Sequence, residues 1–349
     1  MKYLPLLTAI LALLPGTIRA DEGRIAIYQP GTIDRPGSYV LNRDIVVSDG
    51  DALVIRSSQV DLDLNGYAIR ATGGSGALIR IDDGFTSIRI RNGRLLGNDQ
   101  FDGVVYGSTG QVPPIALRLE DLEGRDFRYG VMVQSAGSFE ILSSDFSSCG
   151  SCVVLLSPTE PTGRIVDSRI ADAQYEALLL VQSGMEVRGN ILSTAPLSND
   201  FVERPGVQMM GHGGIVDGNL LVSIDNPPDP TAGIVLAAPG VQVTNNVLDR
   251  HSNGMVIHSD GNHIAGNVIR RNGFNGANDG NGIWMDNLST DPAAGNLIEV
   301  NLIDASLQCA LTFGRFSADN AWRANMRFAN VVGPVCLSGT NNTDEGGNL

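Results

Sequence analysis

The chain has 349 residues, and its 38 acidic against 24 basic residues give a net charge of −14 at neutral pH. Such an acidic surface repels polyanions, so we exclude nucleic acid as a partner. The only lysine is Lys2, at the extreme N-terminus, and this excludes lysine-based catalysis in the rest of the chain.

Residues 1–20 have the pattern of a secretory signal peptide: one lysine, an apolar stretch, Pro15-Gly16 and a small residue at Ala20. The stretch is too short for a membrane span, and no later segment is long and apolar enough to cross a membrane. We therefore expect a secreted or periplasmic protein with no membrane span in the mature chain.

Residues 21–50 precede a repeat and are expected to cap its first coil. The repeat is a small residue followed by alternating apolar residues, as in Gly254-Met-Val-Ile and Gly282-Ile-Trp-Met. The copies recur about every 26 residues and begin at Ala52, Ala77, Gly103, Gly130, Ser151, Ala177, Gly206, Gly233, Gly254, Gly282, Gln308 and Val335. The last two lack the small residue.

Each copy contains two or three short runs rich in Val, Ile and Leu, separated by Gly, Asn, Ser and Asp, which indicates strands and turns. No helical stripe of useful length is present, and 42 glycines argue against helices. Short strands at this period predict an all-β fold, a parallel β-helix of about twelve coils. The second and fourth residues of each copy should face inward, whereas the third and fifth face outward.

An asparagine recurs once per coil, before or within a later strand of the copy. Stacked side-chain amides can hydrogen-bond along the axis, so we interpret this series as structural. Its members are Asn190, Asn219, Asn246, Asn267, Asn301 and Asn325.

The four cysteines of an exported protein are expected to be paired. Cys309 and Cys336 both fall on the second position of adjacent copies, within disulfide range, which leaves Cys149 to pair with Cys152. A zinc site at the Cys149-x-x-Cys152 pattern is the alternative. The polar, glycine-rich tail 341–349 is expected to be disordered, so the predicted β-helix domain spans 21–340.

The outward fifth positions form a mostly apolar strip, on which His258 and Asp286 occupy neighbouring coils, with Trp284 on the same face. A carboxylate beside an imidazole orients it as a general base, so His258 and Asp286 are candidate catalytic residues. The exposed Trp284 suits stacking on a sugar ring. An ordinary exposed ion pair on a sheet surface is the alternative.

No cofactor is required by these patterns. Asn278-Asp279, and Asp225 with Asp229, are candidate oxygen ligands for calcium. The alternative is that they are ordinary turn residues. His251 and His263 sit near turns and are expected to be solvent-exposed.

The segments PGSYVLNRDIVV, ALVIRSSQVDLDLNGYAI and NGMVIHSDGNHIAGNVI resemble exported bacterial members of the right-handed parallel β-helix (pectin-lyase-like) superfamily over residues 25–340. Gly211-His212-Gly213 matches a polygalacturonase motif, but its partner motifs are missing. The resemblance implies a right-handed coil and a protein that binds or processes a polysaccharide or cell-envelope glycan, as a lyase or a hydrolase if it is an enzyme. A non-catalytic envelope or adhesive scaffold that binds a partner is the alternative.

Overall fold

The computed structural model describes residues 23–107, 114–156, 162–195, 205–223, 232–273, 280–286, 293–304, 306–328, 330 and 332–349. The expected signal peptide and the candidate calcium ligands Asp225, Asp229, Asn278 and Asp279 lie outside these ranges. No helix in the described ranges is long and apolar enough to cross a membrane.

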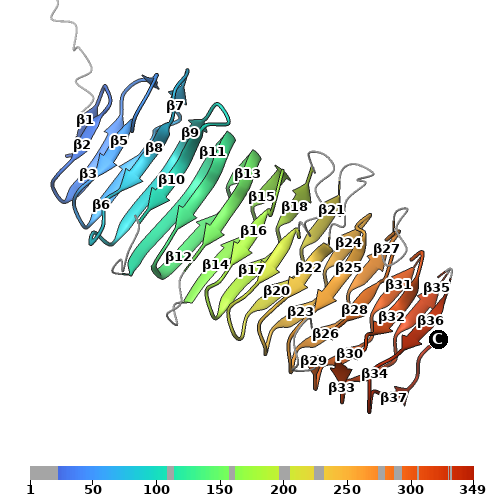
Figure 1. Ribbon diagram of the computed structural model, residues 1–349. Coiled ribbons are helices and arrows are strands. Elements are labelled where there is room, and N and C mark those ends of the chain that lie inside the picture. Colours follow the sequence, from blue (N-terminus) through green and yellow to red (C-terminus); the bar gives the residue numbers. More distant parts are fainter. Residues whose placement is uncertain are drawn as a thin grey trace, which may run out of the picture.

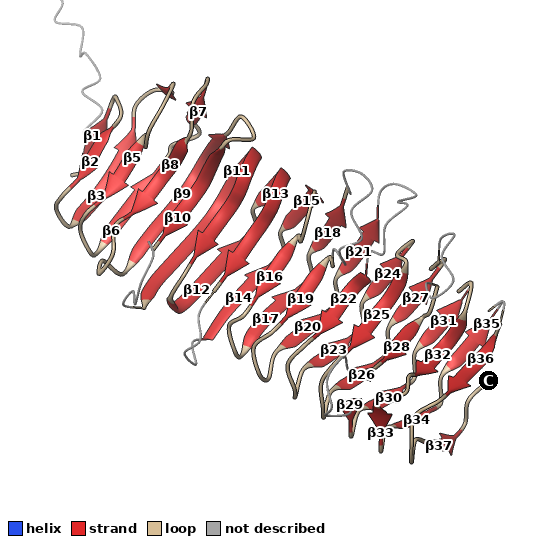
Figure 2. Ribbon diagram, in the orientation of Figure 1, coloured by secondary structure: helices blue, strands red, loops and turns tan. Residues whose placement is uncertain are grey.

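The chain winds into a long solenoid whose two ends lie far apart (Figure 1). Figure 2 shows strands and loops and no helix in the described part of the chain. Each strand pairs in parallel with its counterpart one coil away, so the expected all-β, right-handed parallel β-helix is confirmed.

Three parallel sheets run the length of the solenoid. The first contains β2 (Gly31–Ile33), β5 (Leu53–Ile55), β8 (Gly76–Ile81), β10 (Phe101–Tyr106), the ends of β11 (Ile115–Val133) and β13 (Asp145–Leu155), then β16 (Leu178–Leu180), β19 (Val207–Met209), β22 (Ala232–Leu236), β25 (Asn253–Ile257), β28 (Ile283–Met285), β32 (Cys309–Phe313) and β36 (Gly333–Leu337).

The second sheet contains β1 (Ile25–Ile27), β3 (Gly37–Leu41), β6 (Val60–Asp63), β9 (Ile88–Leu96), β11, β12 (Ala136–Leu142), β14 (Thr162–Val166), β17 (Met185–Arg188), β20 (Ile215–Asp217), β23 (Gln242–Thr244), β26 (His263–Ala265), β30 (Leu297–Glu299), β34 (Ala321–Arg323) and β37 (Thr343–Gly346).

The third sheet contains β4 (Ile45–Val47), β7 (Ala68–Ala71), the later part of β9, the middle of β11, the start of β13, β15 (Arg169–Ala173), β18 (Ile191–Thr194), β21 (Leu220–Ser223), β24 (Val247–Asp249), β27 (Val268–Arg270), β31 (Leu302–Asp304) and β35 (Met326–Phe328). A separate small pair joins β29 (Ala293–Ala294) to β33 (Ser317–Ala318).

The core is the inside of the solenoid, where second and fourth positions stack coil on coil, as in Met255 over Ile283 and Ile257 over Met285. The predicted frame, which is the assignment of residues to the numbered positions of each copy, is wrong in four copies. Ile79 and Val153, one residue later than expected, occupy the second position, and in the last two copies Leu311 and Val335 do so. These copies contain runs of adjacent small or apolar residues, so alternation alone does not specify which residue faces inward.

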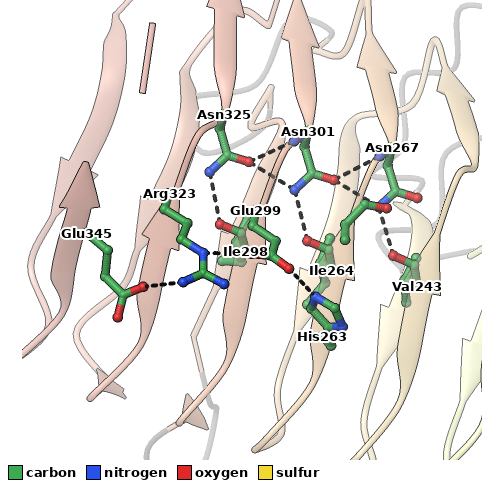
Figure 3. Close-up of polar contacts among 11 residues, drawn as sticks. Val243, His263, Ile264, Asn267, Ile298, Glu299, Asn301, Arg323, Asn325 and Glu345 are labelled. Carbon is green, nitrogen blue, oxygen red and sulfur yellow. Dashed lines mark hydrogen bonds and ion pairs between the residues drawn. The ribbon is translucent and has the colours of Figure 1, made fainter. Parts of the chain in front are cut away.

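The predicted asparagine ladder is present at the turn between the second and third sheets. Each buried side-chain oxygen accepts hydrogen bonds from the main-chain and side-chain N–H groups of the asparagine one coil earlier, as Asn301 does for Asn267 at 3.0 and 2.9 Å (Figure 3). A second ladder, which the sequence analysis missed, runs through Asn262, Asn296, Asn320 and Asn342 at the turn before the second sheet. Both ladders satisfy buried backbone groups and hold successive coils at one spacing.

Both expected disulfides, Cys149–Cys152 and Cys309–Cys336, are formed. The register argument for the second was wrong, because Cys309 lies opposite Gly333 and Cys336 lies opposite Thr312. The tail is also ordered rather than disordered. Thr343–Gly346 forms β37, which pairs with β34, and Asn348 extends the first ladder by accepting a hydrogen bond from the Asn325 N–H at 3.0 Å.

Candidate functional site

Trp284 lies on the outer face of the first sheet, in the middle of β28. Its side chain is half-buried and packs against a small apolar cluster formed by Ala232, Val235 and Val256 of the two preceding strands. Val256 lies directly opposite Trp284, so strand alternation puts both side chains on the same outward face. The cluster holds the indole in place while part of the ring stays open to solvent.

His258 directly follows β25 and places its ring beside Trp284. The two ring centroids are 6.5 Å apart and the planes meet at 73°, an edge-to-face arrangement. The His258 Nδ1 is in hydrogen-bond contact with the main-chain oxygen of Asp286. A carbonyl oxygen only accepts, so Nδ1 carries the proton of the neutral imidazole and Nε2 carries the lone pair. The main chain therefore fixes the ring so that Nε2 is the nitrogen with a free lone pair.

The expected contact between the Asp286 carboxylate and the imidazole is not made. The carboxylate accepts the N–H of Phe316 at 2.9 Å instead, and so holds the turn that follows β32. That turn approaches closely because residue 314 is glycine. A Cβ at Gly314 would lie 2.4 Å from the Asp286 Cγ. Asp286 therefore serves His258 through its carbonyl, while its side chain anchors the neighbouring turn.

The same turn brings two residues that the sequence analysis missed. Arg315 is exposed and its guanidinium lies 5.1 Å from the ring centroid of Phe316, which is itself 37% exposed. The sequence did contain a signal for these two residues, because they directly follow Gly314, the residue one coil beyond Asp286. The misplaced frame of the Gln308 copy put Thr312 there instead.

Toward the N-terminus the strip is partly as expected, with Val181, Met210 and Ala237 facing outward. At its far end the fifth position is Asp82 rather than Ile81, and the Asp82 carboxylate pairs with Arg56 at 2.6 Å. The first-sheet face thus has charged groups at both ends and mostly apolar side chains between them.

Solved structures similar to this one come from several kinds of protein. A DFA-IIIase from Arthrobacter chlorophenolicus A6, solved in complex with GF2, matches with a TM-score of 0.53 and 15% identity, over 83% of this chain and 82% of that one. The Dettilon tailspike protein matches with a TM-score of 0.52 and 16% identity, over 89% and 60%. The A-module of a mannuronan C-5 epimerase from Azotobacter vinelandii has 14% identity over 94% and 91%, with a TM-score of 0.44.

The chain has the pectin-lyase-like fold. The sequence itself matches no family model and no curated protein. At these identities the likeness defines the architecture of the chain alone, and its chemistry has to be argued from its own side chains.

The remaining histidines of the chain have different environments. His251 was expected to be exposed, but it is 1% exposed, because the turn it occupies points into the solenoid, and burial lowers its pKa to about 4. His263 is partly exposed and contacts Glu299 at 2.8 Å (Figure 3). His212 is exposed in a turn. Among the described residues, no three His, Cys, Asp or Glu side chains are arranged to hold a metal ion.

Proposed function

We propose that this protein binds a polysaccharide along the first-sheet face and removes a proton from it with His258. The observation that carries the proposal is the imidazole orientation: Nδ1 is held by the Asp286 carbonyl, so Nε2 is the basic nitrogen, beside a half-exposed Trp284. An indole face stacks on a sugar ring, and a positioned imidazole is the most common general base.

The side chains favour proton abstraction over hydrolysis. Glycoside hydrolysis ordinarily uses a pair of carboxyl groups flanking the bond. In the described part of this site, the Asp286 carboxylate is bound to the Phe316 N–H. The exposed cation Arg315 is suited to an acidic sugar, whose carboxylate it would neutralise as the neighbouring proton is removed. A lyase or epimerase reaction on an acidic polysaccharide fits these groups best.

The fold supports this proposal by analogy only, since the structurally similar DFA-IIIase was solved in complex with GF2. Export would place the protein where cell-envelope or extracellular glycans occur, and the two disulfides fit an oxidising compartment.

The test is a screen of the purified protein against acidic and neutral polysaccharides, recording unsaturated-product absorbance and reducing ends, with and without calcium. His258→Ala should lower kcat by about 100-fold or more, the usual contribution of a general base. Trp284→Ala should mainly raise KM. His212→Ala, an exposed histidine in a turn, is the matched control and should behave as wild type.

Turnover that survives in His258→Ala would contradict the proposed base. Binding without turnover on any substrate, weakened by Trp284→Ala, would instead favour the non-catalytic scaffold.

A further inference from the structure

A second surface with its own chemistry lies on the outer face of the second sheet. A groove of roughly 550 Å³ crosses β9, β11, β12, β14 and β17. Small side chains line it in register, with Ala116 opposite Ser138 and Ser138 opposite Thr162. The groove therefore runs along the solenoid axis, with neighbouring strands about 4.8 Å apart.

Beside these small residues runs a row of long charged side chains, two positions further along each strand. Arg89, Arg118, Glu140 and Arg164 lie opposite one another in that order. Glu120 contacts both Arg89 and Arg118, and Glu140 contacts Arg118 at 3.1 Å and Arg164 at 2.7 Å. The result is a continuous ladder of alternating cations and anions.

The guanidinium groups form the outer layer of this ladder. The side chains of Arg89, Arg118 and Arg164 are 45%, 43% and 47% exposed, whereas Glu120 is 9% and Glu140 is 26% exposed. Burial acts to raise the pKa of Glu120, but hydrogen bonds from Arg89 and Arg118 outweigh it and hold the pKa below its ordinary value. Glu186, which is 44% exposed and lies opposite Arg164, ends the row on β17, so the row as a whole is balanced in charge. Over β9, β11, β12 and β14, however, the outermost charges are guanidinium groups, in a protein whose net charge is −14.

We propose that this groove binds an extended anionic glycan through its carboxylate or sulfate groups. Guanidinium groups spaced along one line suit repeated anionic groups on a polymer that lies parallel to the axis. The exposed hydroxyls of Ser138 and Thr162 are placed to bond sugar hydroxyls. The proposal concerns binding alone, on a different sheet from His258, and stands independently of catalysis there.

The test is calorimetric titration of the full chain with a galacturonate hexamer, a sulfated dextran oligosaccharide of similar length, and maltohexaose, at low and at raised sodium chloride. Either or both anionic probes should bind and maltohexaose should not, and the binding should weaken with salt because partly exposed charges are screened. The two anionic probes distinguish carboxylate from sulfate as the recognised group.

Three variants are expected to weaken, to tighten and to leave unchanged the affinity for the anionic probes. Arg164→Ala should weaken binding about tenfold by removing a charged hydrogen-bond donor. Glu140→Gln should tighten binding about threefold, because it removes an anion and keeps the shape. Arg323→Ala on β34 removes a comparable partly exposed arginine, bound to Glu299 at 2.7 Å, and should leave affinity unchanged.

The His258→Ala variant should bind these probes in the groove as wild type does. Unchanged affinity in Arg164→Ala, weaker binding in Glu140→Gln, tighter binding of maltohexaose, or no binding of either anionic probe would each overturn the proposal. Circular dichroism of every variant would exclude misfolding as the cause of a loss.

Discussion

The buried His251 should make the protein acid-sensitive in a defined pH range. The pKa of its imidazole is lowered from 6.5 to about 4, first by burial, with the Leu221 carbonyl and the Asp249 charge acting weakly in the opposite direction. Each pKa unit corresponds to about 1.4 kcal/mol, so the difference between folded and unfolded chains is worth roughly 3 kcal/mol.

The sign follows from which state binds the proton. Above pH 6.5 the imidazole is neutral in both states and contributes nothing. As the pH falls from 6.5 toward 4, the unfolded chain gains a proton that the folded chain does not, so the free energy of unfolding decreases. Below about pH 4 the loss is complete.

The measurement is urea unfolding followed by tryptophan fluorescence at pH 7.5, 5.5 and 4.0, for wild type and His251→Leu. The wild type should lose roughly 3 kcal/mol more than the variant between the first and last pH. His212→Leu, which changes an exposed histidine, should follow the wild type. Parallel pH dependence in wild type and His251→Leu would refute the reasoning, whatever their absolute stabilities.

Three further predictions concern the ladder, the disulfides and the site. Asn301→Ala should cost about 3 kcal/mol in urea unfolding, because the Ile264 carbonyl and the Asn267 N–H lose their partner, whereas the exposed Gln242→Ala should change stability by less than about 0.5 kcal/mol. Mild reductant should open Cys309–Cys336 before Cys149–Cys152, because Cys336 is partly exposed whereas both cysteines of the other disulfide are buried. The order is measured by thiol alkylation and mass spectrometry, and the reverse order would contradict this. Asp286→Asn keeps an acceptor for the Phe316 N–H and keeps the carbonyl, so turnover in the polysaccharide screen should stay within about threefold of wild type. A loss as large as in His258→Ala would restore the carboxylate to a catalytic role.

The fold was predictable because a solenoid repeats its physical constraints. Each coil must bury one face of each strand and satisfy the same turn, so Gly254-Met-Val-Ile and Gly282-Ile-Trp-Met carry the same signal one coil apart. The prediction lost accuracy where the signal was degenerate. In Ala77-Leu-Ile every residue is small or apolar, and only the pairing of Ile79 with Leu53 identifies the inward residue.

The candidate site was predictable only at the level of faces. Alternation placed His258 and Trp284 on one outward surface, and their rings do lie side by side. Alternation gives no side-chain torsion, so the Asp286 carboxylate was assigned to the wrong neighbour. Its real partner is Phe316, and that contact depends on the close approach that Gly314 permits in the next coil. His251 was misjudged for a related reason, because a turn residue in a solenoid can point inward as readily as outward.

The residues that hold the solenoid together are different from the residues that can act on its surface. The stacked apolar side chains and the asparagine ladders face inward and give every coil the same spacing, so a substitution there disturbs several coils at once. Outward groups on two different sheets lack that coupling, so Trp284 on one sheet can change independently of Arg164 on another. Because both outer surfaces share the axial spacing, each presents its groups at the same regular interval along the axis. A polymer lying lengthwise can match that interval on either face, which is why we expect a glycan chain rather than a compact ligand on both.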